Sequence, residues 1–130
     1  MSWYPFVGLL LGSLLVTVDL FLSKVFSSQI TTVLLMLLLI GITRGLHQDG
    51  LADMVDGLAG GRSAQARLAI MRDGRVGAIG ATGLFLALAL RFAGLNAMPP
   101  AEHMTLLIGM PVVGRWAMVV GSFHVTYARS

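Results

Sequence analysis

Three carboxylates lie close together in the segment GLHQDGLADMVDG, residues 45–57. Asp49, Asp53 and Asp56 are half of the six acidic residues in the chain. On a helix they fall within an arc of about 60°, because successive residues turn by about 100°. Carboxylates this close repel one another unless a cation lies among them or some of them are protonated. The chain has no Cys and no convergent set of His, so hard oxygen ligands indicate Mg²⁺, Mn²⁺ or Ca²⁺ rather than zinc.

The acidic segment also has a purely structural interpretation. Asp–Gly is a turn signal, so Asp49 would cap a helix, and the three acids would form a solvated face at a membrane edge. His47, in the same segment, would serve as a general base beside the metal or would have a structural role. The residues alone leave both interpretations open.

A second cluster of charged residues lies in the segment MRDGRVGAIGATG, residues 71–83. Arg72 and Arg75 flank Asp73 directly before an apolar run. Arginine binds phosphate oxygens with two N–H groups, and a glycine-rich turn lets backbone N–H groups approach an anion. Alternatively, the arginines anchor a membrane segment, with Asp73 paired to one of them, and the glycines form a close-packed helix face. These glycines recur at every third position, at Gly74, Gly77, Gly80 and Gly83.

Carboxylates, a divalent metal and arginines together are the groups that proteins use for phosphoryl or phosphodiester transfer. Metal ions bridge the phosphate oxygens, and arginines neutralise the charge that develops. Because the clusters lie beside apolar segments, the expected substrate is lipid-like or otherwise bulky. No nucleic-acid partner is expected, since the sequence has no long basic stretch with interleaved aromatic residues.

Membrane helices are the elements that would position these residues. The chain has 130 residues, of which 56% are hydrophobic and only 12% charged, whereas a soluble domain carries about 25% charged residues. We therefore expect an all-α fold: a polytopic membrane helical bundle of about four transmembrane helices with short cytoplasmic helices, in which residues 1–130 form a single integral membrane domain. The expected spans are 5–23, about 29–43, about 77–95 and about 104–123. The second span is short unless it continues into the acidic segment.

The segment 43–76 is predicted to lie in the cytoplasm. It holds five of the nine basic residues, all of them arginines, and positively charged loops stay on the cytoplasmic side of a membrane. Within it we expect two helices separated by a break at 57–63, whose glycines Gly57, Gly60 and Gly61 are able to take positive φ. Ser63 is the expected N-cap of the second helix, and Gly74 is the residue expected to end it.

Three charged residues fall inside the predicted spans: Asp19, Arg91 and Arg115. A charge in lipid is costly, so such a residue usually pairs with another or lines a cavity. Arg115 would contact a substrate or form a structural ion pair, for which Asp19 is a candidate partner.

The acidic segment resembles the signature of the cobalamin synthase family, also called adenosylcobinamide-GDP ribazoletransferase. The family pattern is roughly Gly-x-His-x-Asp-Gly-Leu-Ala-Asp-x-x-Asp-Gly, and nine positions between Gly45 and Gly57 fit it. The segment IMRDGRVGAIGATG resembles the family's second block, Met-Arg-Asp-Ser-Arg-x-Gly-x-x-Gly, and YPFVGLLLG at 4–12 resembles its first span. Met54 replaces a common Thr, and Gly74 replaces the usual Ser. Family members continue into further membrane helices, so this chain is predicted to be a fragment, partial relative to the family.

The resemblance implies a late step of cobalamin synthesis. The 3′-hydroxyl of α-ribazole, or of α-ribazole 5′-phosphate, attacks the cobinamide-side phosphorus of adenosylcobinamide-GDP. GMP leaves, and adenosylcobalamin or its 5′-phosphate forms. Mg²⁺ is the implied cofactor, with Mn²⁺ as a substitute. The implied partners are these substrates and the lipid bilayer of the cell inner membrane, with the active-site segment facing the cytoplasm, and a homo-oligomer is compatible with the family.

The resemblance also implies roles for individual residues. The implied metal ligands are Asp49, Asp53 and Asp56. The residues implied to hold the pyrophosphate are Arg72 and Arg75. The implied catalytic residues are Asp73 and His47, one of which would accept the hydroxyl proton or bind a second metal.

Two other functions were compared with this one. A CDP-alcohol phosphatidyltransferase also uses clustered helical Asp residues beside a membrane, but its signature places Ala-Arg after the Asp-Gly and spaces the later acids differently. A cation transporter subunit would use the acids as an ion path, which requires acids that face each other on several helices. Here Asp19 is the only acid within a predicted span.

Overall fold

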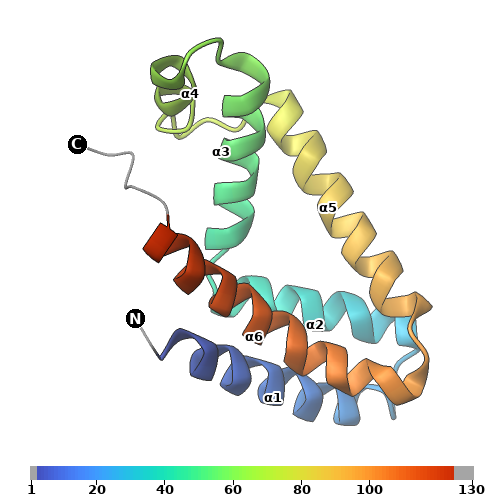
Figure 1. Ribbon diagram of the computed structural model, residues 1–130. Helices are drawn as coiled ribbons and strands as arrows, with labels where there is room; N and C mark the ends of the chain where they lie inside the picture. The colour runs from blue at the N-terminus through green and yellow to red at the C-terminus, as the bar shows by residue number, and fades with distance from the viewer. Residues whose placement is uncertain (1–2, 125–130) are drawn as a thin grey trace. The chain divides into compact units, whose positions relative to one another are not determined.

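The computed structural model describes residues 3–124, apart from the side chain of Pro100. All regular secondary structure in this part of the chain is helical, which confirms the predicted all-α class (Figure 1). The helices are α1 (Tyr4–Leu22), α2 (Ser28–Ile42), α3 (Leu46–Gly60), α4 (Ala64–Ile70), α5 (Ala78–Ala97) and α6 (Pro100–His124). They fall into two compact units: the first comprises residues 1–35 and 97–130, and the second comprises residues 36–96.

Three of the described helices are long and apolar enough to cross a membrane: Tyr4–Leu22, Ala78–Ala97 and Ala101–His124. They agree with the predicted first, third and fourth spans to within a few residues. The helix α2 has only 15 residues, whereas a span needs about 20. It qualifies only as one member of a bent pair with α3.

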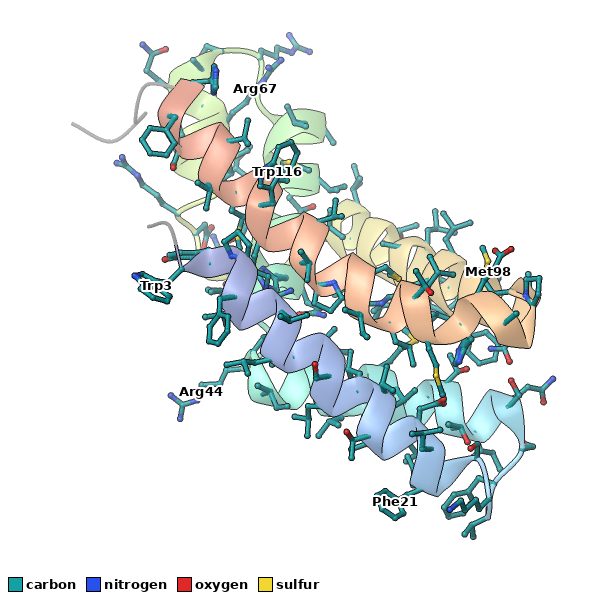
Figure 2. All side chains as sticks on the ribbon, turned by 60° about the horizontal axis from the view of Figure 1, so that its bottom comes forward. Trp3, Phe21, Arg44, Arg67, Met98 and Trp116 are labelled. Atoms are coloured by element: carbon teal, nitrogen blue, oxygen red, sulfur yellow. The ribbon has the colours of Figure 1, made fainter. Side chains whose placement is uncertain are left out.

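The bend between α2 and α3 explains why the second span does not continue into the acidic segment. The two helix axes differ by 87° across a break of three residues. Within the break, Arg44 (φ 53°) and Gly45 (φ 70°) are both left-handed, and the Gly45 N–H donates to the Ile40 carbonyl at 2.9 Å. A left-handed conformation is costly for a residue with a Cβ, by about 1–2 kcal/mol. The Arg44 side chain extends away from the break and is exposed (Figure 2).

In the first unit, α1 and α6 pack antiparallel along their length (Figure 1). Two glycines one helical turn apart make this close approach possible. A Cβ on Gly8 would lie 2.6 Å from the Pro111 carbonyl oxygen, and a Cβ on Gly12 would lie 2.6 Å from the Cα of Ile108. This is the small-residue packing that membrane helices use, because lipid offers no hydrophobic force to drive helices together.

The same helix pair buries two of the chain's ionisable groups. Asp19 on α1 is 8% exposed, and its Oδ2 lies 3.5 Å from Nδ1 of His103 on α6. The structure therefore pairs Asp19 with His103 and not with Arg115, so the suggested Asp19–Arg115 pair is wrong. Arg115 is itself buried, at 9% exposed. In contrast, Trp3 and Phe21 project outward at the two ends of α1, as suits a helix in contact with lipid (Figure 2).

In the second unit, α4 packs against the end of α3. The predicted N-cap is confirmed: Ser63 Oγ accepts a hydrogen bond from the Ala66 N–H at 3.2 Å. The predicted break is narrower than expected, because α3 continues through the helical glycines Gly57 and Gly60 and ends only before Gly61.

The expected positive φ of the glycines at 57–63 is wrong, as Gly45 is the only described glycine with positive φ. Gly57 and Gly61 serve close packing instead. A Cβ on Gly57 would lie 2.8 Å from the Met71 side chain, and one on Gly61 would lie 2.6 Å from the Arg67 backbone nitrogen. The prediction that Gly74 ends α4 is also wrong, since α4 ends at Ile70 with Met71 as its C-cap.

We predict that Gly12→Ala weakens the α1–α6 pair. The added methyl group would overlap the α6 backbone, and such overpacking costs about 1–3 kcal/mol. The free energy of unfolding of the chain in detergent micelles measures this loss. The matched control is Gly114→Ala on α6, where nothing lies within 4 Å of the added Cβ and the change should stay within about 0.5 kcal/mol. Equal effects of the two substitutions would contradict the close packing.

Candidate functional site

The carboxylate of Asp56, on α3, lies at the N-terminus of α5. Its Oδ2 accepts a hydrogen bond from the backbone N–H of Gly77, and its Oδ1 accepts one from the N–H of Gly80, both at 2.7 Å. The first N–H groups of a helix have no partner within the helix and carry partial positive charge, so a carboxylate there is favourable. A helix cap contributes about 0.5–2 kcal/mol. This one also joins two helices, because Asp56 precedes its partners by 21 and 24 residues.

The glycines at the start of α5 make this contact sterically possible. A Cβ on Gly77 would lie 2.6 Å from Oδ1 of Asp56, and a Cβ on Gly80 would overlap the same carboxylate and lie 2.7 Å from the Ala52 carbonyl oxygen. One turn further on, a Cβ on Gly83 would lie 3.0 Å from the Val55 side chain. The interpretation of the glycines as a close-packed face is therefore confirmed for Gly77, Gly80 and Gly83, which pack on α3, and is wrong for Gly74, where nothing lies within 4 Å of an added Cβ.

The turn between α4 and α5 carries an exposed ion pair. Nη2 of Arg75 lies 2.6 Å from Oδ2 of Asp73, and Nε donates to Oδ1 at 3.0 Å. Their side chains are 87% and 44% exposed. The hydrogen bonds from Arg75, together with its charge, lower the pKa of Asp73, and Asp73 in turn raises the pKa of Arg75. The expected pairing of Asp73 with an arginine is thus confirmed.

A hollow of about 420 Å³ lies between α3, the end of α4 and the start of α5. Three of the predicted site residues line it: Asp56 from α3, and Asp73 and Arg75 from the turn. The other lining residues are Gly60, Ile70, Gly77, Ala78 and Ile79. The tertiary structure therefore brings the acidic segment and the arginine segment to one place, although they are separated in the sequence by α4.

The remaining predicted residues lie outside this hollow. Asp49 is exposed and Asp53 half-buried, on the same face of α3 as Asp56 but nearer its N-terminus. Asp49 does not cap α3, because the N-cap position is Gly45, with no side-chain cap. His47 and Arg72 are exposed on the first turn of α3 and on the turn after α4.

The carboxylates that could hold a metal ion differ in their contacts. Across residues 3–124, no three His, Asp or Glu side chains are grouped closely enough to hold a metal ion. Both oxygens of Asp56 are already used by α5, whereas Asp49 and Asp53 make no side-chain hydrogen bond or ion pair within the described chain. Proteins commonly bind Mg²⁺ through one or two carboxylates, with phosphate oxygens and water completing its shell. Metal binding by Asp49 and Asp53, like the set of three carboxylates, therefore stays a prediction.

The capping of α5 by Asp56 is not among the features predicted from the sequence. One signal was present. The residues before α5 are Val76 and Gly77, and neither has a side chain that can cap a helix. The first N–H groups of a helix without a local cap need an acceptor from water or from elsewhere in the chain.

Comparison with known proteins agrees with these observations. The model of the family described as cobalamin-5-phosphate synthase matches residues 1–130. A Desulforamulus reducens protein named adenosylcobinamide-GDP ribazoletransferase is 41% identical over 99% of this chain and 52% of its own length. Proteins of the same name from Syntrophobacter fumaroxidans and Geotalea daltonii are 42% and 43% identical, over 98% and 92% of this chain and 52% and 48% of their own lengths. The chain thus spans about half the length of these relatives. No solved structure matches it.

We predict that Gly80→Ala detaches the start of α5 from Asp56, because the new methyl group takes the place of the carboxylate. Amide hydrogen exchange of Gly77, measured by NMR, should accelerate by about tenfold, the equivalent of about 1.4 kcal/mol of lost protection. Gly74→Ala is the matched control, since nothing lies within 4 Å of a Cβ there. An unchanged exchange rate of the Gly77 amide in Gly80→Ala would show that the two hydrogen bonds to Asp56 do not hold the start of α5.

A second prediction concerns the titration of Asp73. Because Arg75 lowers the pKa of Asp73, the pair stabilises the folded chain at neutral pH, and this contribution is lost as the pH falls through the folded-state pKa. The ¹³C NMR titration of the Asp73 carboxyl should move to higher pH in Arg75→Gln. Arg72→Gln, next to the same carboxylate in sequence, should leave the midpoint in place. The pair is exposed, so its effect on global stability should be small.

Proposed function

The chain belongs to the cobalamin-5-phosphate synthase family, and we propose that it provides part of the site for a phosphate transfer in cobalamin assembly. The proposed reaction transfers the adenosylcobinamide phosphate group from adenosylcobinamide-GDP to α-ribazole or α-ribazole 5′-phosphate. The bond to the GMP phosphate breaks, a bond to the ribazole hydroxyl forms, and GMP and adenosylcobalamin or its 5′-phosphate are released. The name of the relatives, adenosylcobinamide-GDP ribazoletransferase, supports this choice of substrates, since they share 41–43% identity with this chain.

The hollow at the start of α5 is the observation that supports this function best. Arg75 lies at the hollow, and its Nε and Nη2 are occupied by Asp73. Its remaining N–H groups are free to bind phosphate oxygens, as arginine commonly does with two parallel hydrogen bonds. Asp73 thereby orients the guanidinium group while the charge of Arg75 attracts the pyrophosphate. The acidic face of α3 lies on the other side of the same hollow, through Asp56.

The roles of Asp73 and His47 differ in how well the geometry supports them. The ion pair lowers the pKa of Asp73, which makes its carboxylate a weak base and favours the orienting role over proton transfer. His47 stays the proposed base for the hydroxyl proton, since a neutral imidazole nitrogen can accept a proton. Arg72 is exposed on the same turn and would add positive charge near the phosphates.

A divalent metal completes the proposed site. Asp49 and Asp53 are the residues that would hold Mg²⁺, or Mn²⁺ in its place. When bound, the ion would neutralise phosphate charge during the transfer. The apolar helices fit a membrane protein, and the arginine-rich segment between α2 and α5 would face the cytoplasm of a cell with this protein in its inner membrane. A homo-oligomer stays a prediction.

Release of GMP from adenosylcobinamide-GDP, with α-ribazole and Mg²⁺, tests this function in liposomes containing the chain. Arg75→Ala should lower kcat/KM by about 10²–10³-fold, as expected for the loss of one group that stabilises transferred charge, and Asp53→Asn should abolish turnover. Arg62→Ala is the matched control, because Arg62 is exposed and does not line the hollow.

The full-length Desulforamulus reducens relative serves as a positive control for the assay. If that relative releases GMP while this chain instead conducts cations across the liposome membrane, the transfer function is contradicted in favour of ion transport. Release of CMP from a CDP-alcohol in place of GMP would favour a phosphatidyltransferase.

A further inference from the structure

The hydrogen bonds of Asp56 make it poorly suited to bind a metal ion, the role proposed for Asp49 and Asp53 on the same helix. Each of its oxygens already accepts a backbone N–H at 2.7 Å, whereas Asp49 and Asp53 make no such bonds within residues 3–124. If the Asp56 carboxylate turned toward a metal ion, the N–H groups of Gly77 and Gly80 would lose their acceptor. Helix N-termini left without partners are unfavourable when they are shielded from water, and Gly80 is buried.

The segment that carries the arginines has few other contacts to hold it. All residues from 72 to 79 are exposed, so little apolar surface is buried there to fix their position. Gly77 follows Arg75 by two residues, and its N–H is bonded to Asp56. The start of α5, and with it the path of the chain through Arg75, is therefore set by the carboxylate on α3.

We propose that Asp56 is a positioning residue of the transfer site, which holds Arg75 beside the acidic face of α3 and does not join Asp49 and Asp53 as a metal ligand. The positioning of Arg75 for phosphate rests on the proposed function, whereas the link between Asp56 and the arginine segment does not. Glycine at positions 77 and 80 follows from this role, because a Cβ at either position would displace the carboxylate.

A distance measurement tests the positioning role directly. The chain has no Cys, so spin labels can be placed singly at Leu46→Cys, at the start of α3, and Val76→Cys, next to Arg75. Both side chains are exposed, at 70% and 55%. Pulsed electron paramagnetic resonance of the doubly labelled chain in nanodiscs should give one narrow distance distribution. Asp56→Ala should broaden and shift it, whereas Asp49→Asn, on the same helix face, should leave it unchanged.

Two further variants keep this test decisive. Asp56→Asn retains one acceptor oxygen and should restore part of the narrow distribution, which a general loss of folding would not do. Gly80→Ala breaks the same contact from the α5 side and should reproduce the broadening of Asp56→Ala. The positioning role is overturned if Asp56→Ala leaves the distribution unchanged, or if Asp49→Asn broadens it equally.

Binding of Mn²⁺, followed by its electron paramagnetic resonance signal, tests whether Asp56 is a metal ligand. Asp53→Asn should weaken Mn²⁺ binding by about tenfold or more, because even residues that only support a metal ligand cost that much when they are replaced. Asp56→Asn should change it by less than about twofold, because the Asp56 carboxylate bonds the α5 backbone and supports neither Asp49 nor Asp53. Equal losses in the two variants would overturn the assignment.

Binding of inorganic pyrophosphate tests whether Asp56 acts through Arg75. Asp56→Ala and Arg75→Ala should each weaken binding, and the double variant should be no weaker than Arg75→Ala, because residues that act as a unit are not additive. Fully additive losses would overturn the coupling. A parent chain that binds neither Mn²⁺ nor pyrophosphate would refute the proposed function, while the spin-label distances would still decide whether Asp56 holds the arginine segment.

Discussion

The two hydrogen bonds from α5 to the Asp56 carboxylate are the interaction on which the second unit depends. They connect an acidic helix to the start of an apolar one, across a short helix and an exposed turn. The interaction is favourable because a helix N-terminus presents unpaired N–H groups and partial positive charge. It also creates the hollow, since the residues around it come from both sides of this contact. A carboxylate that looks like one of three equivalent acids in the sequence thus has a separate structural task.

Glycine makes close backbone approach possible in both units, for different reasons. Between α1 and α6, Gly8 and Gly12 let two apolar helices approach until backbone meets backbone, which increases van der Waals contact. Between α3 and α5, Gly77 and Gly80 let a polar side chain reach the backbone N–H groups of another helix. The high glycine content, 16 of 130 residues, therefore supports both packing and the architecture of the site, and left-handed φ is needed at only one described glycine.

The chain distributes its few acids in an informative way. Asp19 pairs with His103, Asp56 caps α5, Asp73 pairs with Arg75, and Glu102 lies in the first turn of α6, where negative charge is favourable. Each of these has a partner or position that accounts for it structurally. Asp49 lies in the first turn of α3, a favourable position of the same kind, whereas Asp53, one turn further along, has no such partner or position within the described residues.

The amino-acid sequence by itself determined the all-helical class, three of the four spans to within a few residues, the Ser63 cap and the family. These depend on local properties: apolar run length, capping chemistry and motif spacing act within one helix or turn. Only the tertiary structure decided that α2 and α3 are separated by an 87° bend, that Asp19 pairs with His103, that Gly57 and Gly61 serve packing, and that Asp56 belongs to α5. Each of these depends on which distant backbone or side chain comes within reach, and residue spacing along one helix carries no information about its partner. The spacing of Asp49, Asp53 and Asp56 placed all three on one face, but the N-terminus of a helix more than 20 residues away gave one of them a different role.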